Sequence, residues 1–169
     1  FWLSIPGTSI DYPVVKSALP GYYLNHTFQG NKNPCGSLFV QGETEQTNER
    51  NTVIFGHNMK DGSMFADLKH YKNKDFYENH KILHIYHKGK RYEGLIFSCQ
   101  IRGEEELECY QTEFPTTAQR HEFISSMKAS SLYPIPISLP EQASVITLLT
   151  CYGRAERMIV QAALVCYTE

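Results

Sequence analysis

The sequence lacks long apolar runs, an excess of either charge and the closely spaced cysteine pairs of metal or redox motifs. No apolar run approaches the roughly 18 residues that a transmembrane helix needs, and the longest, near Val145–Leu149, has the length of a strand. The 16 Lys and Arg residues against 18 Asp and Glu residues give a net charge of −2. A nucleic-acid-binding protein normally carries a basic excess or patch, so this balance argues against that class.

Cysteine is also sparse, with five residues in the chain: Cys35, Cys99, Cys109, Cys151 and Cys166. No CxxC spacing occurs, so the sequence predicts neither a zinc ribbon nor a thioredoxin-like site. So few cysteines argue against a disulfide scaffold, and their odd number leaves at least one thiol without a partner in the chain. A cross-sheet disulfide between Cys99 and Cys109 stays open until geometry decides it.

What the sequence does contain is the composition of an ordinary globular domain. It has 169 residues, of which 41% are hydrophobic and 20% charged, and no internal repeat is visible. At roughly 150 residues per domain, this length predicts a single domain over residues 1–169. The 11 Tyr and 9 Phe residues favour strands, so we expect a β-rich fold.

Short runs rich in β-branched and aromatic residues predict most of the strands. These runs are Ile10–Val15, Ser37–Val40, Thr52–Phe55, Ile82–Tyr86, Tyr92–Cys99, Ser144–Thr150 and Met158–Val165. The last two are the strongest, and Lys88-Gly89-Lys90 predicts a hairpin between two of the others. The polar segment Glu43–Asn51 is expected to be a loop. About eight short strands in all indicate a barrel or a sandwich with helical insertions.

Two segments predict helices among these strands. Thr116 followed by Gln119 forms a capping box, which predicts a helix over Thr117–Ser130. Asp61-Gly62-Ser63 offers a turn and a helix N-cap. The apolar residues that follow share one predicted helical face: Met64, Phe65, Leu68 and Tyr71. Three prolines make Tyr133–Glu141 extended.

A metal site is the weaker interpretation of two further clusters. His80, His84 and His87 would share a helical face, but the local alternation predicts a strand that places His84 and His87 on opposite faces. Glu104–Glu108 (EEELE) lacks the spaced ligands of a calcium loop and is expected to be a solvated loop. The sequence also contains no Gly-rich phosphate loop and no GxSxG motif.

Cys151 and His57 are the strongest candidates for catalysis. Each follows one of the expected strands, and strand ends hold functional groups on a rigid base. A nucleophilic Cys needs a His close in space rather than in sequence. Arg154 and Arg157 lie just beyond Cys151, and a nearby cation favours the reactive thiolate. The competing interpretation is that the Cys and the His merely cap strands.

Two segments then carry a resemblance to a known family. They are Asn51–Phe65 (NTVIFGHNMKDGSMF) and Ile146–Arg157 (ITLLTCYGRAER), the second followed by the apolar run Met158–Leu164. GHN, TLxTC and a downstream Arg before a β run together resemble the sortases, the cysteine transpeptidases of Gram-positive cell surfaces. Further features resemble class B, in order over nearly the whole chain: Ile5–Val15 (IPGTSIDYPVV), Tyr22-Tyr23-Leu24, Gly36–Phe39 (GSLF) and the helix near Thr117–Ser130.

The resemblance implies roles for individual residues. Cys151 matches the nucleophile, His57 the acid/base, and Arg157 the family arginine, with Arg154 as its rival. The residues expected to bind substrate are Leu24, Asn58, Leu149 and Thr150. Two departures from the class B pattern bear on substrate preference, because Leu149 stands where Ser is usual and Gln41 where Asp is common.

The same resemblance implies a mainly β fold, a closed eight-stranded sortase-type barrel with N-terminal helical or turn segments and a helix inserted before the last strands. It implies cleavage of a C-terminal sorting signal of secreted proteins through a Cys151 thioester, then transfer to an amine of a peptidoglycan cross-bridge. No metal, organic cofactor or nucleic acid is implied. The implied location is the extracellular face of a Gram-positive cell membrane, with an N-terminal anchor upstream of Phe1.

Three alternatives stay open from the sequence. A pilin-polymerising sortase would use a Lys amine as the acceptor. A Cys/His peptidoglycan hydrolase would use water. A β-barrel binding module would have no chemistry, and its thiols would all react with a labelling reagent at similar rates. Product analysis with and without an added amine separates the hydrolase from a transpeptidase.

Overall fold

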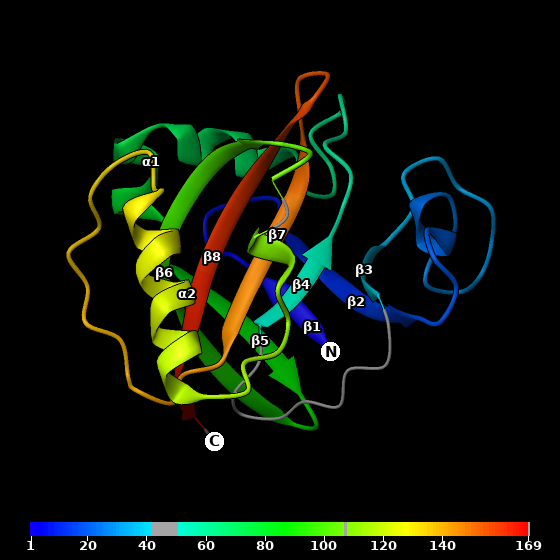
Figure 1. The fold of residues 1–169 in the computed structure, drawn as a ribbon. Helices are drawn as coiled ribbons and strands as arrows, with labels where there is room; N and C mark the ends of the chain where they lie inside the picture. Colours follow the sequence, from blue (N-terminus) through cyan, green and yellow to red (C-terminus); the bar gives the residue numbers. More distant parts are fainter. Residues whose placement is uncertain (42–50, 107, 169) are drawn as a thin grey trace.

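Eight strands in the described part of the chain close into a barrel (Figure 1). The computed structural model describes residues 1–41, 51–106 and 108–168. Around the barrel the strands follow the order β1-β2-β3-β4-β7-β8-β6-β5. Their bounds are β1 Trp2–Ser4, β2 Asp11–Ser17, β3 Leu38–Gln41, β4 Asn51–Phe55, β5 Ile82–His87, β6 Lys90–Gly103, β7 Val145–Tyr152 and β8 Glu156–Thr168. The closed eight-stranded barrel is confirmed, and the sandwich is excluded.

Two of the strand pairs are parallel, and one of them positions the site. β2 pairs with β3 and β4 pairs with β7 in parallel, whereas the other neighbours are antiparallel. In the β4–β7 pair, Phe55 lies opposite Leu149. Since parallel strands end at the same edge of a sheet, the residues that follow β4 and those at the end of β7 come together at one rim of the barrel.

Alternation along β7 divides the core into two clusters. Ile146 and Leu148 point into the barrel, whereas Val145 and Leu149 pack outside it, in the cluster that includes Phe123 of helix α2 (Thr117–Ala129). Figure 1 shows α2 lying along the outside of β6 and β8. Both faces of β7 are buried, one inside the barrel and the other under a helix, and its sequence is therefore a continuous apolar run.

The two buried cysteines belong to different clusters. Cys99 packs in the barrel interior, and Cys109 packs in the outer cluster. Both are free thiols. The disulfide between Cys99 and Cys109 that the sequence left open is therefore excluded, because the sheet itself separates them.

Helix α2 begins where the capping box predicts. The hydroxyl of Thr116 accepts a hydrogen bond from the backbone N–H of Gln119 at 3.2 Å. The helix ends at Ala129, with Ser130 as its C-cap. The proline-rich segment that follows is non-helical, as predicted. None of the helices in residues 1–41, 51–106 and 108–168 combines the length and apolar character needed to cross a membrane.

A helix follows the turn at Asp61-Gly62-Ser63, but it starts later than the sequence predicts and is a 3₁₀ helix. The Asp61 carboxylate closes a local turn by accepting from the N–H and hydroxyl of Ser63, at 3.0 and 2.6 Å. Met64 then has a φ of +56°, which interrupts any helix. A 3₁₀ helix, η2, follows at Ala66–Lys72, and the α-helix α1 covers Lys74–Asn79.

The apolar face of that segment was predicted correctly. Phe65, Leu68 and Tyr71 are all fully buried. Their spacing of three residues fits the three residues per turn of a 3₁₀ helix, and it fits one face of an α-helix as well.

The remaining polar predictions have mixed outcomes. Residues 43–50 of the expected loop Glu43–Asn51 lie outside the described residues, whereas Asn51 begins β4 and is fully buried. His80 follows α1, and its Nδ1 donates to the carbonyl of Phe76 at 2.8 Å. β5 places His84 and His87 on opposite faces, as the strand pattern predicts.

Candidate active site

Three successive hydrogen bonds fasten the segment after β4 to the end of β7. The backbone N–H of Gly56 donates to the carbonyl of Leu149 at 3.2 Å, and the hydroxyl of Thr150 donates to the carbonyl of Gly56 at 2.7 Å. The side-chain amide of Asn58 donates to the carbonyl of Cys151 at 3.0 Å. Continuing the β4–β7 register by two residues places His57 beside Cys151. The two candidates, far apart in sequence, thus meet at one rim.

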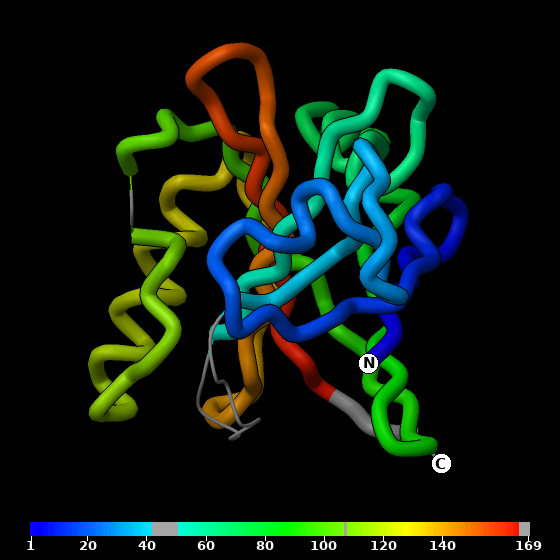
Figure 2. Tube along the Cα trace, turned by 90° about the vertical axis from the view of Figure 1, so that its right-hand side faces the viewer, coloured from blue at the N-terminus to red at the C-terminus, as the bar shows by residue number. Residues whose placement is uncertain are grey.

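The imidazole of His57 is held by a backbone carbonyl. Its Nε2 lies 2.7 Å from the carbonyl oxygen of Leu24. A carbonyl only accepts, so Nε2 carries the hydrogen and Nδ1 is the nitrogen left to exchange a proton. Leu24 ends the short 3₁₀ helix η1 (Tyr22–Leu24), which lies on the arm between β2 and β3 that crosses the front of the barrel in Figure 2.

A glycine seats this arm against the barrel. Gly36 has a φ of +62°, and a Cβ there would come within 2.3 Å of the carbonyl oxygen of Tyr23. The next residue, Ser37, donates its N–H to that same carbonyl at 2.9 Å. This close approach fixes η1, and with it the Leu24 carbonyl that holds His57.

Arg157 lies directly opposite Cys151 across the antiparallel β7–β8 pair. Opposite residues of adjacent strands project to the same face, so the thiol and the guanidinium share the outer face. The guanidinium donates from Nη1 to the carbonyl of Glu156 at 3.0 Å and from Nη2 to the carboxylate of Glu104 at 2.8 Å. Arg154, the rival arginine, lies in the exposed turn between the two strands. The geometry therefore favours Arg157.

The cysteines differ sharply in their surroundings. Cys151 is exposed, whereas burial raises the pKa of Cys99 to about 12 and that of Cys109 to about 11. Because the thiolate is the nucleophilic form, the two buried thiols are poor nucleophiles at neutral pH. Cys151 combines exposure with a strand-end position next to His57 and Arg157.

The residues expected to bind substrate divide into two kinds. Leu24 is 44% exposed and can contact a ligand through its side chain, and Asn58 is half-buried. Leu149 and Thr150 are only 5% and 2% exposed. They shape the floor of the site instead, Leu149 within the outer cluster and Thr150 through its hydrogen bond to Gly56.

A line of four aromatic rings beside the site was not predicted from the sequence. Ring centroids are separated by 6.4 Å between Tyr23 and Phe39, 5.4 Å between Phe39 and Phe55, and 6.1 Å between Phe55 and Tyr110. Tyr110 belongs to the short 3₁₀ helix η3 (Glu108–Tyr110). Burial raises the pKa of its hydroxyl, and the charge and hydrogen bond of Arg157 oppose that rise. The line of aromatic rings therefore ends beside Arg157.

Sequence patterns offered little signal for Tyr110 or for Glu104. Both lie in the polar stretch that follows β6, where no periodicity marks one residue above its neighbours. The expected solvated loop is confirmed at residues 104–106, which are exposed, and two of its carboxylates also form ion pairs, Glu104 with Arg157 and Glu106 with Arg102. Within the described ranges, no three His, Cys, Asp or Glu side chains are grouped to hold a metal ion.

A model of the sortase domain matches residues 3–165, nearly the whole of the barrel. This chain belongs to the sortase family. Sortase B of Listeria monocytogenes is 37% identical over 171 residues, covering 97% of this chain and 68% of that protein. The family identifies the enzyme as a cysteine transpeptidase and does not favour the hydrolase or the binding module.

Solved structures agree with this assignment at the level of the fold. Sortase B of Clostridium perfringens superposes with a TM-score of 0.91 at 33% identity, covering 98% of this chain and 93% of that one. A crystal structure of a sortase B complexed with triglycine superposes with a TM-score of 0.88 at 28% identity, covering 97% of this chain and 78% of that one. These matches place the chain among class B sortases.

Proposed function

We propose that residues 1–169 form one catalytic domain in which Cys151 is the nucleophile, His57 the acid/base and Arg157 the oxyanion and substrate-binding group. The observation that carries this assignment is their arrangement at one rim. Arg157 lies opposite Cys151, and three hydrogen bonds hold the segment containing His57 against the end of β7. The donor substrate is the sorting signal of a secreted surface protein.

The acylation step follows from these groups. The Cys151 sulfur attacks a backbone carbonyl of the sorting signal, which forms a C–S bond and places negative charge on the carbonyl oxygen. When this tetrahedral intermediate collapses, the peptide C–N bond breaks, and His57 gives a proton to the departing amine. A thioester remains on Cys151. The hydrogen bond from Nε2 to Leu24 leaves Nδ1 to deliver that proton.

Arg157 suits the developing negative charge. Its guanidinium is always charged and presents a planar fork of donors. Its bonds to Glu104 and the Glu156 carbonyl fix the plane of that fork, and its remaining N–H groups are available to substrate oxygens. Loss of one such donor costs about 3–4 kcal/mol of barrier in other acyl-transfer sites.

The second step transfers the acyl group to an amine. His57 accepts a proton from the incoming amine, whose nitrogen attacks the thioester and releases Cys151. We propose the amine of a peptidoglycan precursor cross-bridge as the acceptor, and the sortase B complexed with triglycine supports a short peptide amine. Secreted proteins and such amines meet at the extracellular face of a Gram-positive cell membrane, where we place the reaction.

Product analysis tests this function. The enzyme is incubated with a panel of sorting peptides, alone and with triglycine, a cross-bridge mimic or a pilin-derived Lys peptide, and the products are identified by mass spectrometry. We expect cleavage of one backbone peptide bond in a sorting peptide and ligation of its N-terminal fragment to triglycine or the cross-bridge mimic. Ligation only to the Lys peptide would instead assign the enzyme to pilus assembly. Release of the acid at the same rate with and without any amine would overturn transpeptidation.

A further inference from the structure

One row of side chains crosses three strands at the site. β8 lies between β7 and β6, and its residue Arg157 is opposite Cys151 on one side and Arg102 on the other. Because paired residues project to the same face, Arg102 and Arg157 leave adjacent strands on the face that carries the thiol. Like charges directly opposite each other repel, so this row needs an arrangement that keeps the two arginines apart.

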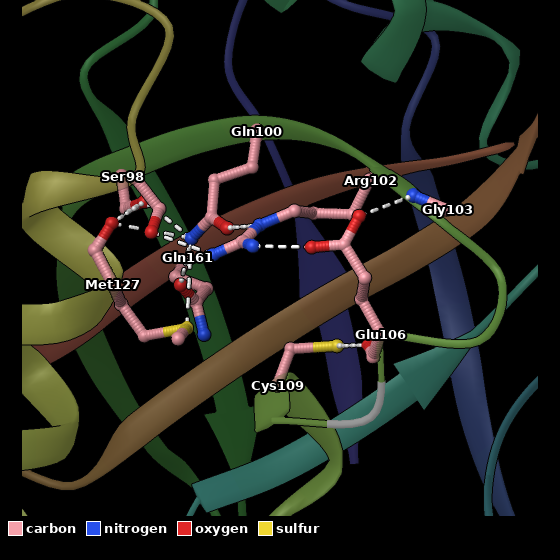
Figure 3. A network of polar contacts seen from close by, with 9 residues as sticks. Ser98, Gln100, Arg102, Gly103, Glu106, Cys109, Met127 and Gln161 are labelled. Carbon is pink, nitrogen blue, oxygen red and sulfur yellow. Dashed lines mark hydrogen bonds and ion pairs between the residues drawn. The ribbon is translucent and has the colours of Figure 1, made fainter.

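Arg102 is restrained by several partners. Its Nε donates to the side chain of Gln100 at 3.0 Å, and its Nη2 donates to the hydroxyl of Ser130 at 2.6 Å. Its Nη1 forms an ion pair with Glu106, whose carboxylate also accepts from the N–H of Gly103 at 2.9 Å. Figure 3 shows this guanidinium lying between Gln100 and Glu106, within a network that extends under α2. Arg102 is thus held away from the thiol by its own glutamate.

Glu104 plays the corresponding part for Arg157. Its carboxylate accepts from Nη2 of Arg157 at 2.8 Å. Its backbone N–H donates to the carbonyl of Ala155 in the β7–β8 turn at 3.0 Å. The residue is thereby fixed at both its main chain and its side chain, although the side chain remains 48% exposed. An exposed ion pair contributes little to folding stability, so its effect should be found in the reaction.

We propose that Glu104 is a positioning residue that holds the Arg157 guanidinium beside Cys151 and apart from Arg102. Together with the carbonyl of Glu156, it engages two nitrogens of the guanidinium and so sets the plane of the donor fork. Without the carboxylate, Arg157 keeps only its contacts with the Glu156 carbonyl and with Tyr110, and Arg102 on the adjacent strand repels it. This inference rests on the role proposed above for Arg157.

A double-mutant cycle tests the proposal. We expect Glu104→Ala to lower the rate of thioester formation about tenfold with little change in KM or melting temperature. In the Arg157→Ala background, where there is no guanidinium to position, the same change should have almost no further effect. Glu104→Gln, which keeps a hydrogen-bond acceptor but not the charge, should fall between Glu104→Ala and the unmodified enzyme.

The neighbouring Glu105 supplies a matched control, since it is an exposed glutamate in the same turn. Glu105→Ala should leave the rate unchanged. If Arg157→Ala is damaging and Glu104→Ala is harmless, or if the two effects multiply independently, the positioning role is wrong and the proposed function stands. If Arg157→Ala is itself harmless, the role of Arg157 in the proposed function fails, and the positioning role with it. Should Glu104→Ala fold poorly, the cycle with Glu104→Gln decides in the same way.

Discussion

The side-chain amide of Asn58 donates a hydrogen bond to the backbone carbonyl of Cys151, 3.0 Å away. This contact joins the residue after one candidate catalytic group to the other candidate, across the rim where β4 and β7 end. Asn58 therefore acts on the placement of His57 relative to Cys151.

Replacing Asn58 should affect the catalytic rate more than the stability of the fold. A hydrogen bond of this kind contributes about 0.5–1.5 kcal/mol, so Asn58→Ala should lower kcat for peptide cleavage by roughly 2- to 12-fold. Asn79→Ala is the matched control, because its amide also donates to a backbone carbonyl, that of Asp75, but on the surface of α1. Equal kcat losses in both variants would show that the contact has no particular bearing on catalysis.

The two arginines near Cys151 should respond differently to substitution. Arg157→Lys removes the planar fork opposite the thiol and should reduce kcat by about 10²–10³. Arg154→Ala changes only an exposed turn and should leave kcat within about twofold. Steady-state cleavage of a fluorogenic sorting peptide measures both. If Arg154→Ala is the damaging change, the two residues exchange roles.

Gly36→Ala should disturb His57 from a distance. The added methyl would meet the Tyr23 carbonyl, displace η1 and loosen the hydrogen bond that the imidazole donates to the Leu24 carbonyl, at a cost of about 1–3 kcal/mol in stability. We expect a lower melting temperature together with a lower kcat.

Gly62→Ala is the control for Gly36→Ala, because it separates the effect of backbone strain from the effect of the clash. Gly62 has a φ of +88°, so the backbone strain is shared, but no atom lies within 4 Å of the added methyl. A kcat as low in Gly62→Ala as in Gly36→Ala would contradict the role assigned to the arm.

Thiol labelling should distinguish Cys151 from the two buried cysteines, Cys99 and Cys109. Burial holds the pKa of Cys99 near 12 and that of Cys109 near 11. At pH 8 at most about 1 in 1,000 of either group is therefore ionised. With iodoacetamide and peptide mapping, Cys151 should be modified far faster than either. As pH rises toward 11, Cys109 should begin to react before Cys99. Comparable rates at pH 8 would contradict the assigned burial and the nucleophile together.

The sequence predicted the frame of the site well because its signals are local. The strands that become β4 and β7 are short apolar runs that end at Gly56 and Cys151, and a capping box marks the start of α2. The sequence did not indicate that η2 is a 3₁₀ helix, because three-residue spacing suits both helix types, nor did it indicate the positive φ of Met64, which precedes the start of η2 at Ala66.

What the sequence did not contain is the set of contacts made across the fold. His57 donates its hydrogen bond to the backbone carbonyl of Leu24, 33 residues away. Every residue type has such a carbonyl, so the sequence gives no sign of this contact. The pairing of Glu104 with Arg157 spans 53 residues and depends on the register of β6 against β8. Such contacts depend on the pairing register of the strands, which is set only when the barrel closes.

Mass spectrometry of the intact enzyme, quenched during turnover of a sorting peptide, tests the nucleophile and the two-step reaction together. The enzyme should gain the mass of the N-terminal peptide fragment, and peptide mapping should locate it on residue 151. The adduct should disappear when triglycine is added, as the ligated product forms. Cys151→Ala should fold normally and show neither adduct nor product. An adduct on another residue, or ligation by Cys151→Ala, would contradict the mechanism.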